Sequence, residues 1–297
     1  MQTIASALKN IASMTRMLAS SNPAAYYQIL GDDVVEGETT QFQDPQKPLW
    51  LNLGYWEHAR TYPEAARAMA QQLGDAAELC RMDTLLDVGF GFAEQDIYWI
   101  ENYDVARIVG LNITPFQVER ARERVQRRGL GERIDLGFGS ATQMPFGANS
   151  FTKVTALECA FHFLTREQFF RESFRVLAPG GRLALADGAA PVGSTVPSFR
   201  SKWILRHWAT PLANYYDRNE YVRLLQRCGF VNVQCRSISH HVFPHTLKYS
   251  DLRRAGGRID TTIVPPLSAA EVQEGLERWG NQGLSEYMIV TADKPAA

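Results

Sequence analysis

Short apolar runs alternate with longer stretches of helical pattern from residue 83 onward. Five of these runs read DTLLDVG, ARIVGLN, RIDLGFG, FTKVTALEC and GRLALAD. Their length and content predict buried strands, and strands that alternate with helices predict a parallel sheet. Two later runs, FVNVQCRSIS and SEYMIVTADK, are separated by a helical pattern from about Ser268 to Trp279. We expect this last pair to form an antiparallel edge of the sheet.

The first twenty residues have apolar positions at helical spacing, and Lys9 and Arg16 interrupt them. This pattern predicts an amphipathic helix rather than a signal peptide. Such a helix either packs on the flank of a domain or covers a pocket as a lid. No apolar run approaches the length of about 20 residues that a membrane-spanning helix needs.

These patterns predict two parts of the chain. Residues 1–80 are expected to form an N-terminal helical lid and the segment before the core, and residues 81–297 an α/β core. We expect two insertions in the core, near 188–218 and 240–283, to cap a binding site.

Composition narrows the class of protein without naming a function. The chain has 297 residues, 45% of them hydrophobic, a formal net charge of −1 and a pI near 6.6. A nearly neutral chain disfavours nucleic acid as the partner. Four cysteines are scattered without the spacing of a zinc site or a disulfide framework, which predicts structural thiols in the reducing cytoplasm. They are Cys80, Cys159, Cys228 and Cys235.

The stretch LLDVGFGFAEQD, residues 85–96, resembles the turn at which many α/β proteins hold a cofactor. A dinucleotide fingerprint has a third glycine where this chain has Glu94. We expect Glu94 and Asp96, in the first turn of the helix, to repel a pyrophosphate. Asp87 at the strand end can attract an ammonium or a sulfonium group. This charge pattern favours S-adenosylmethionine.

Four motifs now resemble, in order and spacing, the class I S-adenosylmethionine-dependent methyltransferases. They are LLDVGFGFA, VGLNITPFQVERAR, GSATQMPFGANSF and RVLAPGGRLALAD. The likeness is strongest to the small-molecule group with macrolide and rifamycin O-methyltransferases, tocopherol methyltransferases and cyclopropane synthases. It implies a Rossmann-like, doubly wound, mostly parallel seven-stranded sheet with an antiparallel last strand. A helical lid with a cofactor-closing segment in residues 1–80, and cap insertions, would complete the fold.

The resemblance also implies which residues hold the cofactor. Gly89 and Gly91 would let its methionyl part pass close to the backbone, with Asp87 near its amino group. A side chain at Gly89 is therefore expected to take the ligand's place with little loss of fold. The family usually has an acid for the ribose hydroxyls where this chain has Asn112, and Gln117 stands where one branch has a second ribose contact.

Two more segments would contact the cofactor. The adenine loop has Ser140 in place of the usual acid, so Ser140, the backbone of Ala141 and Thr142, or a water would meet the adenine amino group. In the segment LNLGYW, Tyr55 and Trp56 would face the reacting centre, where aromatic faces favour a cationic sulfonium. Ordinary core packing explains these two aromatic residues equally well.

The stretch ALECAFHFLTREQ follows the fourth predicted strand, where ligands bind in doubly wound sheets. We expect His162 to be the general base that takes a proton from a substrate hydroxyl. The alternative is a structural histidine that lies between Phe161 and Phe163 and bonds only backbone. Glu158 would lie beneath the cofactor, and Phe163 would contact the substrate.

Two further groups of residues are less informative. His240, His241 and His245 are close in sequence, but we expect Pro244 to break the helix that would align them, so no metal site is predicted. The insertion from residue 188 to 218 is rich in aromatics that would line a substrate pocket or pack between insertion and core. They are Trp203, Trp208, Tyr215 and Tyr216.

The acceptor of the methyl group is the most open question. Residues 196–258 contain eleven Lys and Arg against three acids, which indicates either a solvated face or a site for an anionic acceptor. We predict O-methylation of a hydroxyl on a specialised metabolite, because His162 supplies a base. The alternatives are C-methylation of a prenyl diphosphate or another alkene or aromatic acceptor, and a non-catalytic cofactor-binding module.

Overall fold

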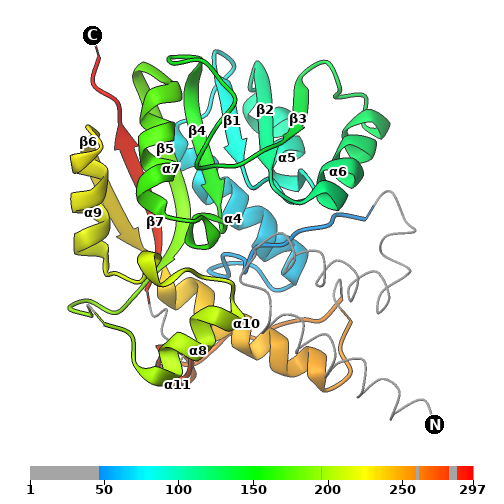
Figure 1. Ribbon diagram of the computed structural model, residues 1–297. Helices are drawn as coiled ribbons and strands as arrows, with labels where there is room; N and C mark the ends of the chain where they lie inside the picture. The colour runs from blue at the N-terminus through cyan, green and yellow to red at the C-terminus, as the bar shows by residue number, and fades with distance from the viewer. Residues whose placement is uncertain (1–46, 195, 259–260, 281–285, 297) are drawn as a thin grey trace.

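A seven-stranded sheet with the order β3-β2-β1-β4-β5-β7-β6 forms the centre of the molecule in the computed structural model (Figure 1). The structure describes residues 47–194, 196–258, 261–280 and 286–296. Strands β1 to β5 are parallel, and β7 runs antiparallel to both β5 and β6. The strands are β1 (Thr84–Val88), β2 (Arg107–Asn112), β3 (Ile134–Phe138), β4 (Phe151–Leu157), β5 (Leu177–Ala189), β6 (Val231–Ser237) and β7 (Glu286–Asp293).

Helices cover both faces of this sheet and extend beyond its end. Alternation of side chains along β1 shows the two cores: Leu85 packs with α4, α5 and α6, and Leu86 packs with α7 and α9. The arrowheads of β1 and β4 in Figure 1 point towards α8 and α10. The helices are α4 (Tyr62–Ala77), α5 (Glu94–Tyr103), α6 (Pro115–Arg127), α7 (Arg166–Val176), α8 (Phe199–His207), α9 (Arg218–Arg227), α10 (Ser239–Arg254) and α11 (Ala269–Gly280), with short 3-10 turns η1 (Ala160–His162) and η2 (Leu212–Asn214).

Local sequence explains where several helices begin. Thr61 and Glu64 form a capping box at the start of α4, and Pro115 occupies the first turn of α6. The side chains of Thr165 and Asp217 accept hydrogen bonds from backbone N–H groups at the starts of α7 and α9. These caps satisfy backbone donors that a helix end leaves without partners.

The structure confirms the predicted sheet, including its antiparallel edge between β6 and β7, and the helix near residues 268–279. The prediction that Pro244 breaks a helix is wrong, because α10 continues through it. Tertiary packing holds the turn of α10 that contains Pro244. The core on one face of the sheet includes its neighbours Val242, Phe243 and Leu247. The predicted amphipathic helix in residues 1–20 lies outside the described residues. In the part that is described, no helix is both long and apolar enough to span a membrane.

Candidate active site

A cavity lies at the carboxyl ends of β1, β2 and β4, where the fold leads us to expect a ligand. It encloses about 1190 Å³, including its open mouth. Gly89 and Gly91 line one part, and His162, Phe163 and Pro211 line another. Further predicted residues line it as well, namely Asn112, Gln117, Ser140, Ala141, Thr142 and Glu158.

The turn between β1 and α5 places three residues in the left-handed region of the backbone. Gly89 has φ +77° and Gly91 has φ +56°. Ala93, where the third glycine usually falls, has φ +62° although it carries a side chain. A Cβ at Gly89 would lie 2.6 Å from Cβ and Sγ of Cys159. The expectation that a side chain there leaves the fold nearly intact is therefore wrong, because it would first meet the protein itself.

Asp87 lies below this turn and does not line the cavity. Its carboxylate accepts hydrogen bonds from Oγ1 of Thr155 (2.7 Å) and from Nε2 of Gln95 (3.0 Å). Burial raises its pKa to about 7. Burial and the neighbouring Asp87 charge raise the pKa of Asp96 well above its usual range. Both carboxyls therefore hold their protons to higher pH than exposed ones do.

Glu94, the other acid of this turn, is paired rather than directed at a ligand. It forms a buried ion pair with Arg124 of α6, and its Oε1 accepts a hydrogen bond from the backbone N–H of Leu49 (2.9 Å). Neither Glu94 nor Asp96 lines the cavity. The prediction that Glu94 and Asp96 repel a pyrophosphate at this turn is therefore wrong. Arg124 pairs with the first carboxylate, and the second is buried.

The residues predicted for the nucleoside form two local pairs. Nδ2 of Asn112 donates to Oε1 of Gln117 (3.0 Å), which fixes both amides at the wall of the cavity. Oγ of Ser140 lies 3.0 Å from Oγ1 of Thr142 and accepts from the Thr142 backbone N–H (3.3 Å). These amides and hydroxyls offer donors and acceptors that suit a ribose and an adenine.

Glu158 follows β4 with φ +53°, a left-handed conformation that points to a constrained turn. Its Oε1 accepts hydrogen bonds from the Leu53 backbone N–H (2.8 Å) and from the Tyr287 hydroxyl (2.5 Å). Burial raises the pKa of Glu158 to about 7. The residue thus ties the segment before α4 to the end of β4, and it lines the cavity as it does so.

His162 ends the turn η1 and is 4% exposed. Its Nδ1 lies 3.4 Å from the carbonyl oxygen of Ala209, and its ring centre lies 4.1 Å from that of Phe161. Burial lowers its pKa to about 4. Because a carbonyl oxygen can only accept, this contact favours the neutral tautomer with hydrogen on Nδ1. The backbone of Trp208 also hydrogen-bonds to this imidazole.

The two aromatic side chains predicted in the segment before α4 lie away from the cavity. Tyr55 contacts the His241 ring and donates to Glu57 (2.6 Å), and Trp56 is fully buried and donates from Nε1 to the Leu53 carbonyl. The expectation that these two rings face the reacting centre is not met. Their segment does line the cavity, but through Leu51 and Asn52.

The aromatics of the insertion also serve mainly as packing. Trp208 meets Trp279 edge to face, and Tyr216 lies over the guanidinium of Arg166 at 5.2 Å. The side chain of Trp203 lies outside the described part. Pro211 is the residue by which this insertion lines the cavity. The pattern of aromatic residues thus indicated the right region but not the right side chain.

Several cavity residues carried no sequence signal of their own. Gln95, Cys159 and Pro211 line it, and Asn214 supports its wall from behind. Gln95 was detectable in principle, since it directly follows the glycine turn. Asn214 was not, because its partners are about fifty residues away along the chain.

The basic residues counted along 196–258 do not gather at this site. No Lys or Arg is among the described residues that line the cavity. Several of them pair with acids instead: Arg223 and Arg227 with Glu220, and Arg254 with Asp251. Within the described ranges, no group of three or more His, Cys, Asp or Glu side chains is arranged to hold a metal ion.

The chain is similar in sequence to known methyltransferases. A family model described as a methyltransferase domain matches residues 86–185. The chain is 34% identical over 295 residues to erythromycin 3''-O-methyltransferase of Saccharopolyspora erythraea, covering 95% of this chain and 93% of that protein. It is 30% identical to 27-O-demethylrifamycin SV methyltransferase of Amycolatopsis mediterranei, covering 86% of this chain and 94% of that protein.

Solved structures show the same fold. The [4+2]-cyclase SpnF has a TM-score of 0.67 at 22% identity, covering 89% of this chain and 94% of that chain. Geranyl diphosphate C-methyltransferase from Streptomyces coelicolor, solved with Mg²⁺, geranyl diphosphate and S-adenosyl-L-homocysteine, has a TM-score of 0.62 at 21% identity, covering 78% and 80%. One of these proteins is named a cyclase, so the fold alone does not define the reaction.

Proposed function

The chain belongs to the S-adenosylmethionine-dependent methyltransferases, and from this premise we propose that it methylates a hydroxyl oxygen of a small specialised metabolite, with His162 as the base. The single observation that carries the choice of oxygen is a buried, neutral histidine in the wall of the cavity. The names of the two relatives support it. No described Lys or Arg in the cavity wall would bind a diphosphate, which disfavours a prenyl diphosphate acceptor.

The described residues fit the cofactor. The glycine turn leaves room for a ligand close to the backbone, and the paired amides of Asn112 and Gln117 suit ribose hydroxyls. Ser140 and Thr142 would meet the base of the nucleoside. When bound, S-adenosylmethionine supplies an electrophilic methyl group that leaves its sulfur as the new carbon–oxygen bond forms.

His162 would take the proton that the hydroxyl loses. Its pKa of about 4 keeps the imidazole neutral near pH 7, the form that can accept a proton. An imidazole of such low pKa is a weak base, so the site acts chiefly by holding the reacting groups in line. We expect general-base catalysis by His162 to raise the rate of methyl transfer by about 10²-fold.

Residues before α4 would close the cofactor end of the site. Leu49, Leu51 and Asn52 line the cavity, and the Leu53 backbone is bonded to Glu158. This arrangement supports the division of the chain into a closing segment and a core. The four cysteines are free thiols, which supports a reducing compartment such as the cytoplasm.

The test supplies S-adenosylmethionine with candidate acceptors and measures S-adenosylhomocysteine release and product mass. The panel contains 27-O-demethylrifamycin SV, an erythromycin with a free 3''-hydroxyl, and geranyl diphosphate with Mg²⁺. We expect an O-methylated product, lost by about 10²-fold in His162→Gln and kept in His240→Gln, whose histidine is exposed. A C-methylated diphosphate as sole product, or full turnover by His162→Gln, would overturn the proposal.

A further inference from the structure

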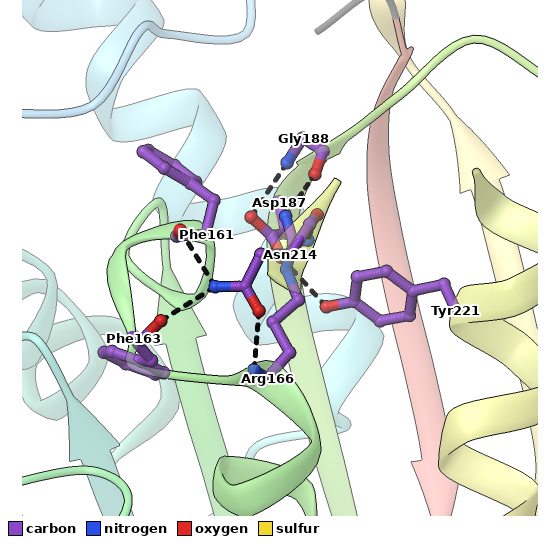
Figure 2. A network of polar contacts seen from close by, with 7 residues as sticks. All are labelled: Phe161, Phe163, Arg166, Asp187, Gly188, Asn214 and Tyr221. Carbon is purple, nitrogen blue, oxygen red and sulfur yellow. Dashed lines mark hydrogen bonds and ion pairs between the residues drawn. The ribbon is translucent and has the colours of Figure 1, made fainter. Parts of the chain in front are cut away.

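The side chain of Asn214 holds the turn that carries His162 from behind. Nδ2 of Asn214 donates to the carbonyl oxygens of Phe161 (3.2 Å) and Phe163 (2.8 Å), the residues on either side of His162. Its Oδ1 accepts from the backbone N–H of Arg166 (2.8 Å). Figure 2 shows the amide between the two carbonyls and the start of α7. All three hydrogen-bonding groups of the amide are therefore used to fix this turn.

Asn214 is itself anchored to the sheet. The Arg166 guanidinium donates to the Asn214 backbone carbonyl (2.5 Å), to Asp187 at the end of β5 (2.7 Å) and to the Gly188 carbonyl (2.5 Å), as Figure 2 shows. Asp187 also accepts from the Tyr221 hydroxyl (2.9 Å). Arg166, Asp187 and Asn214 are each 0% exposed. Such a network of buried, satisfied polar groups has one well-defined geometry.

The same short segment reaches His162 and the cavity as well. Ala209 supplies the carbonyl oxygen next to Nδ1 of His162, and Pro211 lines the cavity. Residues 209–214 thus contact the turn of His162 on one side through Ala209 and on the other through Asn214. An acceptor that touches Pro211 touches the segment that sets the orientation of the imidazole.

We propose that Asn214 is a positioning residue, which fixes the His162 turn so that the imidazole keeps its hydrogen on Nδ1 and its place in the wall of the cavity. This inference deepens the proposed function and rests on it. The contact from Nδ1 to Ala209 is long at 3.4 Å, so it selects a tautomer only while the turn is held in place. Without the Asn214 amide, two buried carbonyl oxygens lose their donor and the turn relaxes.

The test uses NMR on ¹⁵N-histidine-labelled protein, which reads the tautomer and the titration of His162 without any acceptor. Loss of its signals in His162→Gln assigns them. In the wild type we expect one tautomer, protonated on Nδ1, that titrates well below the usual histidine range. In Asn214→Ala we expect mixed tautomers and a titration midpoint raised by about one pH unit. Affinity for S-adenosylhomocysteine should change less than about threefold.

Two further variants keep the test decisive. Asn214→Asp preserves the shape of the side chain and the hydrogen bond from the Arg166 backbone, but it replaces the amide donor with an oxygen. We expect it to show the same mixed tautomers and raised titration midpoint, so it supplies the test if Asn214→Ala does not fold. Leu212→Ala changes an exposed neighbour in η2 and should match the wild type. Wild-type tautomer and titration in a folded Asn214 variant would overturn the inference. Undiminished methylation by His162→Gln would instead overturn the base role.

Discussion

Gly89→Ala separates backbone strain from steric conflict at the cofactor turn. Gly89 has φ +77°, and an added Cβ would lie 2.6 Å from both Cβ and Sγ of Cys159. Cys159 cannot easily move away, because its Sγ donates to the Val88 carbonyl (3.0 Å) and its side chain is buried. Gly180 offers a matched control: its φ is also +77°, and an added Cβ there has nothing within 4 Å.

The two variants should therefore differ by the cost of the conflict with Cys159. A left-handed alanine costs about 1–2 kcal/mol, of which the stiffer unfolded chain returns about 0.4–1 kcal/mol. Gly180→Ala should then lower the free energy of unfolding by about 1 kcal/mol. Overpacking costs a further 1–3 kcal/mol or so, which gives about 2–4 kcal/mol for Gly89→Ala.

Urea unfolding followed by tryptophan fluorescence measures both changes, and calorimetry measures S-adenosylhomocysteine affinity. We expect Gly89→Ala to lose affinity by at least about tenfold, since the displaced turn lines the cavity, and Gly180→Ala to keep it. Equal stability of the two variants, within about 0.5 kcal/mol, would refute the argument from Cys159.

Three other predictions follow from buried groups. Because burial lowers the pKa of His162 to about 4 from about 6.5 when unfolded, protons favour unfolding between these values, and about 3 kcal/mol of stability is lost as pH falls through them. Urea unfolding at about pH 7 and about pH 4 measures this loss, and we expect it to be absent in His162→Gln. An equal loss in the wild type and in His162→Gln would contradict the prediction. Arg166→Met leaves Asp187 buried without its cation and should lower the free energy of unfolding by about 3–5 kcal/mol. Arg171→Met breaks an exposed ion pair on the same helix and should lower it by less than about 1 kcal/mol. Similar losses in the two variants would argue against the buried network. Ala93→Gly removes the strain of a left-handed alanine and should raise the free energy of unfolding by up to about 1 kcal/mol. Thermal unfolding measures the change as a higher melting temperature, and a lower melting temperature would disprove the prediction.

The pattern of apolar positions predicted the strands, and the glycine turn together with the family resemblance located the site. The five short apolar runs became β1 to β5, and the two late runs became the antiparallel pair β6 and β7. The glycine turn and the stretch after β4 meet at one cavity, because carboxyl ends of parallel strands share an edge of the sheet. The apolar runs and the glycine turn are sequence signals that come from residues close together in the chain.

Contacts between distant side chains were decided by the tertiary structure. Glu94 was correctly placed in the first turn of a helix, yet its charge is neutralised by Arg124, thirty residues away. Tyr55 and Trp56 lie in the right segment but pack against α10. Asn214 reaches Phe161 from fifty-three residues away.

The physical reason is the range over which each preference acts. Periodicity, caps and left-handed turns express the conformational preferences of a few adjacent residues, so the sequence by itself determined the strands, the start of α6 at Pro115 and the glycine turn. Charge, protonation and orientation in the site depend on which buried group meets which partner. Desolvation makes those partners energetically decisive, and only the packing of the whole chain chooses them.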